Sequence, residues 1–177
     1  FFTLATYKKD DKQRLIGISS GQAYNLSSAS NVSVYDNLTF NSDRCQTVQY
    51  KDYLYFMNGI DTPKVYHLDD ENNETFSDWG FRNDKLTPSK IIAGGVSKQF
   101  FWALEKNTLR VWYSAQAGNI SGDLNCFDLS SIARFGGHLM AVCNWTVDGG
   151  QGIDDLTVFI TSEGEVLVYD GTNPNSA

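Results

Sequence analysis

The chain has 177 residues and is acidic, with 21 Asp and Glu against 14 Lys and Arg and a formal net charge of −7. Proteins that bind nucleic acids cluster Lys and Arg against phosphates, whereas this chain has only brief basic pairs such as Lys8-Lys9, so we expect no specific nucleic-acid binding. No apolar run approaches the roughly 18 residues of a membrane-spanning helix, and we expect no membrane partner. The length predicts a single domain over residues 1–177.

Four stretches share one pattern, in which an apolar strand, a short turn and a second strand end on or near a tyrosine. They are residues 15–26, 53–68, 100–114 and 154–170. In the last of them the turn is Thr161-Ser162-Glu163-Gly164, where Gly164 supplies the positive φ that short hairpins need. The closing tyrosines recur about 42, 47 and 56 residues apart, at Tyr24, Tyr66, Tyr113 and Tyr169.

This spacing brackets the roughly 40–50-residue period of propeller blades. We therefore predict an all-β fold of repeated antiparallel hairpins arranged as β-propeller-like blades, with a β-sandwich or an irregular stack of hairpins as the alternatives. Closing a propeller takes about four or more blades, so the chain is expected to form an incomplete propeller. Because the opening FFTLATY already has the pattern of a strand, we expect the chain to be a segment of a longer polypeptide.

The segments between the hairpins are interpreted mainly as loops. Residues 25–44 are expected to form a loop with an edge strand, and residues 69–90 a polar surface loop with its own aromatic plug of Phe76, Trp79 and Phe81. Gly94-Gly95 is expected to form a turn. The glycine pair within residues 134–142 argues against a helix in that apolar run.

Several motifs together resemble the tail hub or nozzle proteins of short-tailed bacteriophages, also described as tail tubular or packaged-DNA stabilising proteins. The motifs are YFMNGIDTPKVYHLDD (55–70), RVWYSAQAGN (110–119), DLSSIARFGGHLMAV (128–142), DGGQGIDDL (148–156) and FITSEGEVLVYDGTNPNSA (159–177). The resemblance implies a propeller-containing structural subunit that forms a homo-oligomeric ring in the virion tail. It further implies attachment to adaptor and other tail proteins, retention or channelling of the genome, and assembly in the bacterial cytoplasm.

The sequence gives little support for a metal site. His67 and His138 are the only histidines and have no partners that the sequence can place beside them, so structural roles are favoured over metal binding or base catalysis. Asp148, Asp154 and Asp155 flank a glycine-rich loop at residues 148–155 that could bind Ca²⁺, but they lack the spacing of a calcium loop. A solvated loop is the favoured interpretation, and we predict neither a metal site nor a cofactor.

Catalytic motifs are missing as well. The sequence contains no Gly-x-Ser-x-Gly, His-Glu-x-x-His or Gly-x-x-x-x-Gly-Lys motif. Neighbouring carboxylates such as Asp69-Asp70 point to opposite faces of a strand, so they do not form a glycosidase pair. We therefore predict that the protein is not an enzyme.

The three cysteines, Cys45, Cys126 and Cys143, show no Cys-x-x-Cys spacing, so zinc binding and redox catalysis are not expected. Cys143 lies in an apolar strand and is predicted to pack as a small hydrophobic residue. A Cys126–Cys143 disulfide stays open as an alternative, although reduced thiols fit a bacterial cytoplasm.

A carbohydrate-binding propeller, such as a receptor-binding adhesin of a virion, is the alternative function. Sugar rings stack on exposed aromatic side chains, and Trp79, Trp112 and Trp145 are the candidates. Trp112 lies on a predicted strand and is expected in the core. Trp79 lies in the polar segment and is therefore the predicted ligand contact.

Overall fold

The protein is built from β-strands arranged in four sheets, as seen in a computed structural model that describes residues 2–176 apart from 37, 117, 119–121 and 149–152. The described residues contain no α-helix, only the short 3₁₀ helices η1 (Pro88–Lys90) and η2 (Pro174–Ser176). Within them, no helix is long and apolar enough to cross a membrane. The prediction of an all-β chain of repeated antiparallel hairpins is confirmed.

Apart from β9, the strands of each sheet follow one another along the chain as an antiparallel meander. Sheet I contains β1 (Thr3–Lys9), β2 (Lys12–Ser19), β3 (Gln22–Asn25) and β4 (Ser33–Val34). Sheet II contains β5 (Gln46–Tyr50), β6 (Tyr53–Met57), β7 (Lys64–Leu68) and β8 (Glu74–Asp78). Sheet III contains β10 (Ile91–Ser97), β11 (Phe100–Glu105), β12 (Arg110–Ser114), β13 (Gly122–Asp128) and, in parallel at its edge, β9 (Phe81–Arg82). Sheet IV contains β14 (Leu139–Asp148), β15 (Ile153–Thr161) and β16 (Val166–Tyr169).

The four predicted hairpins are the second and third strands of the four sheets. In every sheet the closing tyrosine of the sequence pattern lies on the third strand. Gly164 has φ +78 in the turn between β15 and β16, as expected. The repeat seen in the sequence is therefore a repeat of whole sheets, each with a further strand before the hairpin.

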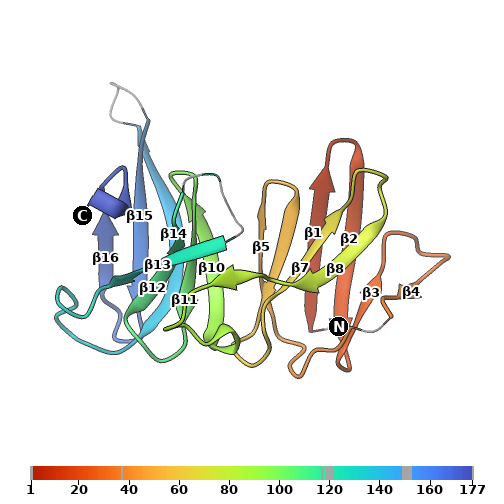
Figure 1. Ribbon diagram of the computed structural model, residues 1–177, viewed down its shortest axis with the longest axis horizontal. Helices are drawn as coiled ribbons and strands as arrows, with labels where there is room; N and C mark the ends of the chain where they lie inside the picture. The colour runs from red at the N-terminus through yellow and green to blue at the C-terminus, as the bar shows by residue number, and fades with distance from the viewer. Residues whose placement is uncertain (1, 37, 117, 119–121, 149–152, 177) are drawn as a thin grey trace.

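The sheets stand in a row, and Figure 1 shows sheet I (red) and sheet IV (blue) at its opposite ends. The first strands of neighbouring sheets, β1, β5, β10 and β14, lie next to one another in succession. Three hydrophobic clusters fill the boundaries I–II, II–III and III–IV. Sheets I and IV lie too far apart in this row to close a ring, so the described residues form an open succession of blade-like sheets.

The central sheets are buried on both faces, which explains their nearly continuous apolar strands. In β6, Leu54 and Phe56 pack towards sheet I while Tyr55 and Met57 pack towards sheet III. All six residues of β11 are buried in the same way. Successive side chains of a strand point to opposite faces, so such runs indicate a sheet with a neighbour on each side.

The prediction of a surface loop at 69–90 is wrong, because this segment supplies β8 and β9. β8 completes sheet II by pairing with β7 along its whole length, and Phe76 packs in the cluster between sheets I and II. Its exposed polar residues are compatible with a strand because β8 is an edge strand. The polar composition of residues 69–90 therefore gave no sign of β8, which is stabilised by its pairing with β7.

The prediction of a turn at Gly94-Gly95 is also wrong, because β10 runs straight through both residues. A Cβ atom at Gly94 would lie 2.9 Å from the Trp102 carbonyl oxygen, and one at Gly95 would lie 2.9 Å from the Val142 carbonyl oxygen. The glycines thus allow close backbone approach, within sheet III and between sheets III and IV.

Candidate interaction face

Trp79 is a core residue, and its expected exposure is wrong. Its side chain is 6% exposed, and its ring centroid lies 5.2 Å from Tyr55, 5.0 Å from Phe101 and 4.7 Å from Phe81. The residue follows β8 directly and fills the boundary between sheets II and III. Trp79 still lines a pocket of about 250 Å³, together with Tyr53, Tyr55, Val65, His67, Ser77, Asp78 and Gly80.

The two histidines lie in different sheets, so the structure does not bring them together. His67 is on β7, where its Nδ1 atom is buried without a hydrogen-bond partner among the described residues and its ring lies 5.0 Å from Tyr53. His138 precedes β14, and its carbonyl accepts a hydrogen bond from Ser162. The described part of the chain holds no group of three metal-ligating side chains.

The proposed calcium loop lies largely outside the described residues, which exclude 149–152 and the side chains of Asp148 and Asp154. Of its three carboxylates, only Asp155 can be placed. One of its oxygens accepts a hydrogen bond of 2.8 Å from the Thr146 hydroxyl on the facing strand.

Cys126 and Cys143 are both free and exposed, so the alternative of a disulfide between them is not realised. The predicted packing of Cys143 in a core is wrong, because on β14 it is Val142 that faces sheet III while Cys143 points to the opposite face. Cys45 is the most protected thiol, and burial raises its pKa to about 12.

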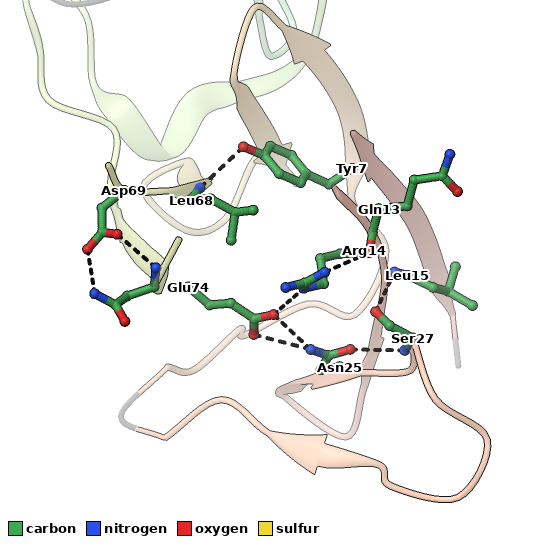
Figure 2. A network of polar contacts seen from close by, with 10 residues as sticks. Tyr7, Gln13, Arg14, Leu15, Asn25, Ser27, Leu68, Asp69 and Glu74 are labelled. Atoms are coloured by element: carbon green, nitrogen blue, oxygen red, sulfur yellow. Dashed lines mark hydrogen bonds and ion pairs between the residues drawn. The ribbon is translucent and has the colours of Figure 1, made fainter. Parts of the chain in front are cut away.

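A polar network joins sheets I and II beside their shared hydrophobic cluster, as Figure 2 shows. Arg14 on β2 donates to Glu74 on β8 at 2.5 Å, and the Asn25 amide on β3 donates to both oxygens of the same carboxylate at 3.0 and 3.2 Å. The hydrogen bond to Glu74 raises the pKa of the Arg14 guanidinium. The side chains of Arg14, Asn25 and Glu74 thus bond to one another and form a latch between the two sheets.

The Asn58-Gly59-Ile60-Asp61 motif fastens the connection between the same two sheets. Asp61 accepts hydrogen bonds from the Asn58 side chain at 2.7 Å and from the Asn41 backbone at 2.8 Å. Burial raises the pKa of Asp61, but the hydrogen bonds from Asn58 and Asn41 outweigh it, and the pKa lies below its ordinary value. Gly59 has φ +70, which allows the tight turn.

Glu105 is a buried carboxylate in sheet III. It ends β11 with 1% exposure and accepts hydrogen bonds from Trp112 Nε1 and from Arg110 Nη2, each at 2.9 Å. Glu105 and Arg110 are the next residues after the paired Leu104 and Val111, so an acid and a base on either side of a short turn were the signal that the sequence offered. The role is structural, because both oxygens are used.

The outer face of sheet IV, which points away from sheet III, is apolar and uncovered. Thr157 and Phe159 on β15 point inwards, where the Thr157 hydroxyl donates to Ser97 Oγ at 2.7 Å and Phe159 is fully buried. The alternate residues of the three strands therefore form the outer face. They are Ala141, Cys143, Trp145, Leu156, Val158, Ile160, Val166 and Val168.

Several side chains of this outer face are well exposed, although Val158 at its centre is only 6% exposed. Val166, Val168 and Trp145 are 56%, 51% and 55% exposed. The outer face of sheet I at the other end of the row carries Leu4 but also the polar Thr6, Lys8 and Gln13. A contiguous exposed apolar patch marks an interaction site, and sheet IV presents the larger one.

Comparisons of this chain with protein-family models, with curated proteins and with solved structures gave no match.

Proposed function

We propose that the protein is a non-enzymatic structural subunit of a bacteriophage tail, of the hub or nozzle type. In this role its row of sheets is part of a β-propeller-like ring that attaches to an adaptor and helps to retain or channel the genome. The observation that carries the proposal is the open row of sheets ending in a bare apolar face on sheet IV.

The order of the strands in the row of sheets supports this proposal. Each of sheets I–III has at least four strands, and its first strand lies beside the first strand of its neighbour. Propellers consist of such four-stranded sheets around a channel. A row whose ends do not meet leaves room for further sheets in the same assembly.

The motifs of the phage tail resemblance also have structural roles that suit an assembling scaffold. Asn58 and Asp61 fasten the connection between sheets I and II. The Gly-Glu-Val-x-Val-Tyr run, residues 164–169, forms the turn and β16 strand that border the apolar face. The acidic net charge suits a channel wall to which DNA does not adhere.

Immunogold electron microscopy of virions from the phage that encodes the chain tests the proposal. Antibodies raised against the chain are expected to decorate the tail, and decoration should vanish after preincubation of the antibodies with the purified chain. Decoration of the capsid alone, or virions without any label, would contradict a tail function.

Saccharide binding is the second candidate, favoured by the aromatic lining of the pocket beside Trp79. Retention on a glycan array should then fall in a Trp79→Ala variant. Because Trp79 is also a core residue, Tyr53→Ala is the second variant, and Trp145→Ala, outside the pocket, is the control. An array without retention of the natural chain would exclude this candidate.

A further inference from the structure

The outer face of sheet IV is equivalent to faces that are covered elsewhere in the molecule. Sheets I, II and III each bury one face under the sheet that follows in the chain, with first strand beside first strand. Sheet IV repeats the apolar strand pattern of those sheets, since Leu156, Val158, Phe159 and Ile160 give β15 a nearly continuous apolar run. The pattern therefore predicts a further sheet on the outer face, with its first strand beside β14.

The charges of the two ends of the chain distinguish between the surfaces that could cover the outer face of sheet IV. Residues 139–177, which include sheet IV, contain six acidic residues and no Lys or Arg. Residues 1–36, which include sheet I, contain four basic residues and three acidic ones. Two copies that met sheet IV to sheet IV would bring two acidic regions together, whereas sheet I of another copy lies in a region with a small excess of basic residues.

The outer face of sheet I also offers apolar side chains where this contact would form. Leu4 on the first strand, β1, is 60% exposed, and Phe2 just before that strand is 68% exposed. Leu15 lies on the same face of β2, opposite Thr6. In a single copy the apolar side chains of Leu4 and Phe2 stay in contact with water. A neighbouring sheet would bury them, which is favourable.

We propose that sheet IV of one copy packs on sheet I of a second copy, head to tail. This inference rests on the proposed role of the chain as a ring-forming subunit. The contact continues the succession of sheets across the boundary between copies, so that β14 of one copy lies beside β1 of the next. The interface is heterologous, because its two sides come from different surfaces of the chain.

Two lysine variants, Ile160→Lys and Leu4→Lys, test this arrangement by sedimentation velocity over a range of concentrations. Each variant places a charge on only one side of the contact, so each alone should associate about tenfold more weakly or worse than the natural chain. A mixture of the two retains one intact sheet IV face and one intact sheet I face. Mixing should therefore restore association up to a dimer, which requires a heterologous contact.

Other outcomes would overturn the proposal. If Leu4→Lys alone associates as the natural chain does while Ile160→Lys does not, sheet IV pairs with itself. If the natural chain stays monomeric at every concentration, a second copy is not the occupant. Tail decoration by immunogold with a monomeric chain would overturn this inference alone and leave the proposed tail function standing.

Two controls separate association from folding. Ser131→Lys adds the same charge in an exposed turn outside both faces and should leave association unchanged. All variants should stay folded, and at a dilution where the natural chain is monomeric their unfolding free energies in urea should lie within about 1 kcal/mol of its value, since both positions are solvent-exposed. The natural thiols give a second readout, because association should slow maleimide labelling of Cys143 on the outer face and not that of Cys126 on sheet III.

Discussion

The two faces of sheet IV are made by the same three strands but differ in what covers them. The inner face packs Phe159, Leu139 and Val142 against sheet III, while the outer face exposes Val166 and Val168. Both faces are apolar. The difference therefore lies in the neighbouring sheet and not in the strands, and the proposed contact between copies would give the outer face a neighbour too.

The largest expected effect is a loss of stability when a residue on the inner face is shortened. The comparison is the same change at its neighbour on the outer face. Phe159→Ala should lower the free energy of unfolding by about 3–5 kcal/mol, because it leaves a cavity between sheets III and IV. Ile160→Ala should cost about 1 kcal/mol or less in the single copy, since the side chain is already 37% exposed. Urea unfolding at low protein concentration measures both values. Equal losses would show that the outer face is covered in the isolated chain.

The second prediction concerns the buried carboxylate of Glu105 at the end of β11. Glu105→Leu should cost about 1–3 kcal/mol, because Trp112 Nε1 would be left buried without an acceptor. Glu105→Gln keeps an acceptor oxygen and should cost less. The matched control is Glu163→Leu at an exposed turn, which should change the unfolding free energy by no more than about 0.5 kcal/mol. Similar results for Glu105→Leu and this control would contradict a structural role for the carboxylate.

The latch between sheets I and II should have a smaller effect. Glu74→Gln should lower the unfolding free energy by about 1 kcal/mol, since the carboxylate accepts from Arg14 and Asn25 at a partly exposed site. A double-mutant cycle with Arg14→Gln, measured by urea unfolding, should give a coupling of about 0.5–1 kcal/mol that decreases in high salt. A coupling of zero would mean that the hydrophobic cluster alone holds this boundary.

The smallest effect is a pH dependence at the connection between these sheets. The pKa of Asp61 is lower in the folded chain, so its ionised form stabilises the fold above the unfolded pKa of about 4. That contribution, about 0.5 kcal/mol at this largely solvated site, is lost as the pH falls through the folded pKa. In urea unfolding, Asp61→Asn should be less stable than the natural chain at pH 7, and the difference should shrink in acid. A difference that does not change with pH would contradict this.

Local patterns in the sequence predicted the hairpins because each is set by neighbouring residues. Alternating or continuous apolar strands, a turn such as the one at Gly164, and a tyrosine on the third strand were sufficient. β8 was missed because its polar residues are stabilised by pairing with β7, a contact that local composition does not reveal. Gly94-Gly95 was mistaken for a turn because close approach between sheets also requires glycine.

The candidate site was harder to predict, since burial depends on contacts between sheets. Trp79 follows a polar stretch yet packs on Tyr55 and Phe101, while Cys143 follows an apolar one yet is exposed. The apolar run of β15 gave no indication that one of its faces is partly exposed. Local composition does not show which face of a sheet lies against another sheet.

Gly95 and Trp102 lie at the same boundary, between sheets III and IV, and differ greatly in bulk. The glycine brings the backbone of β10 close to Val142 on β14, while the indole on the next strand, β11, occupies the space further out. The layer of side chains between sheets III and IV is therefore thin between the first strands, β10 and β14, and thicker between the strands that follow. This difference in thickness contributes to the angle between sheets III and IV, so a few side-chain volumes help to determine how one sheet is set against the next.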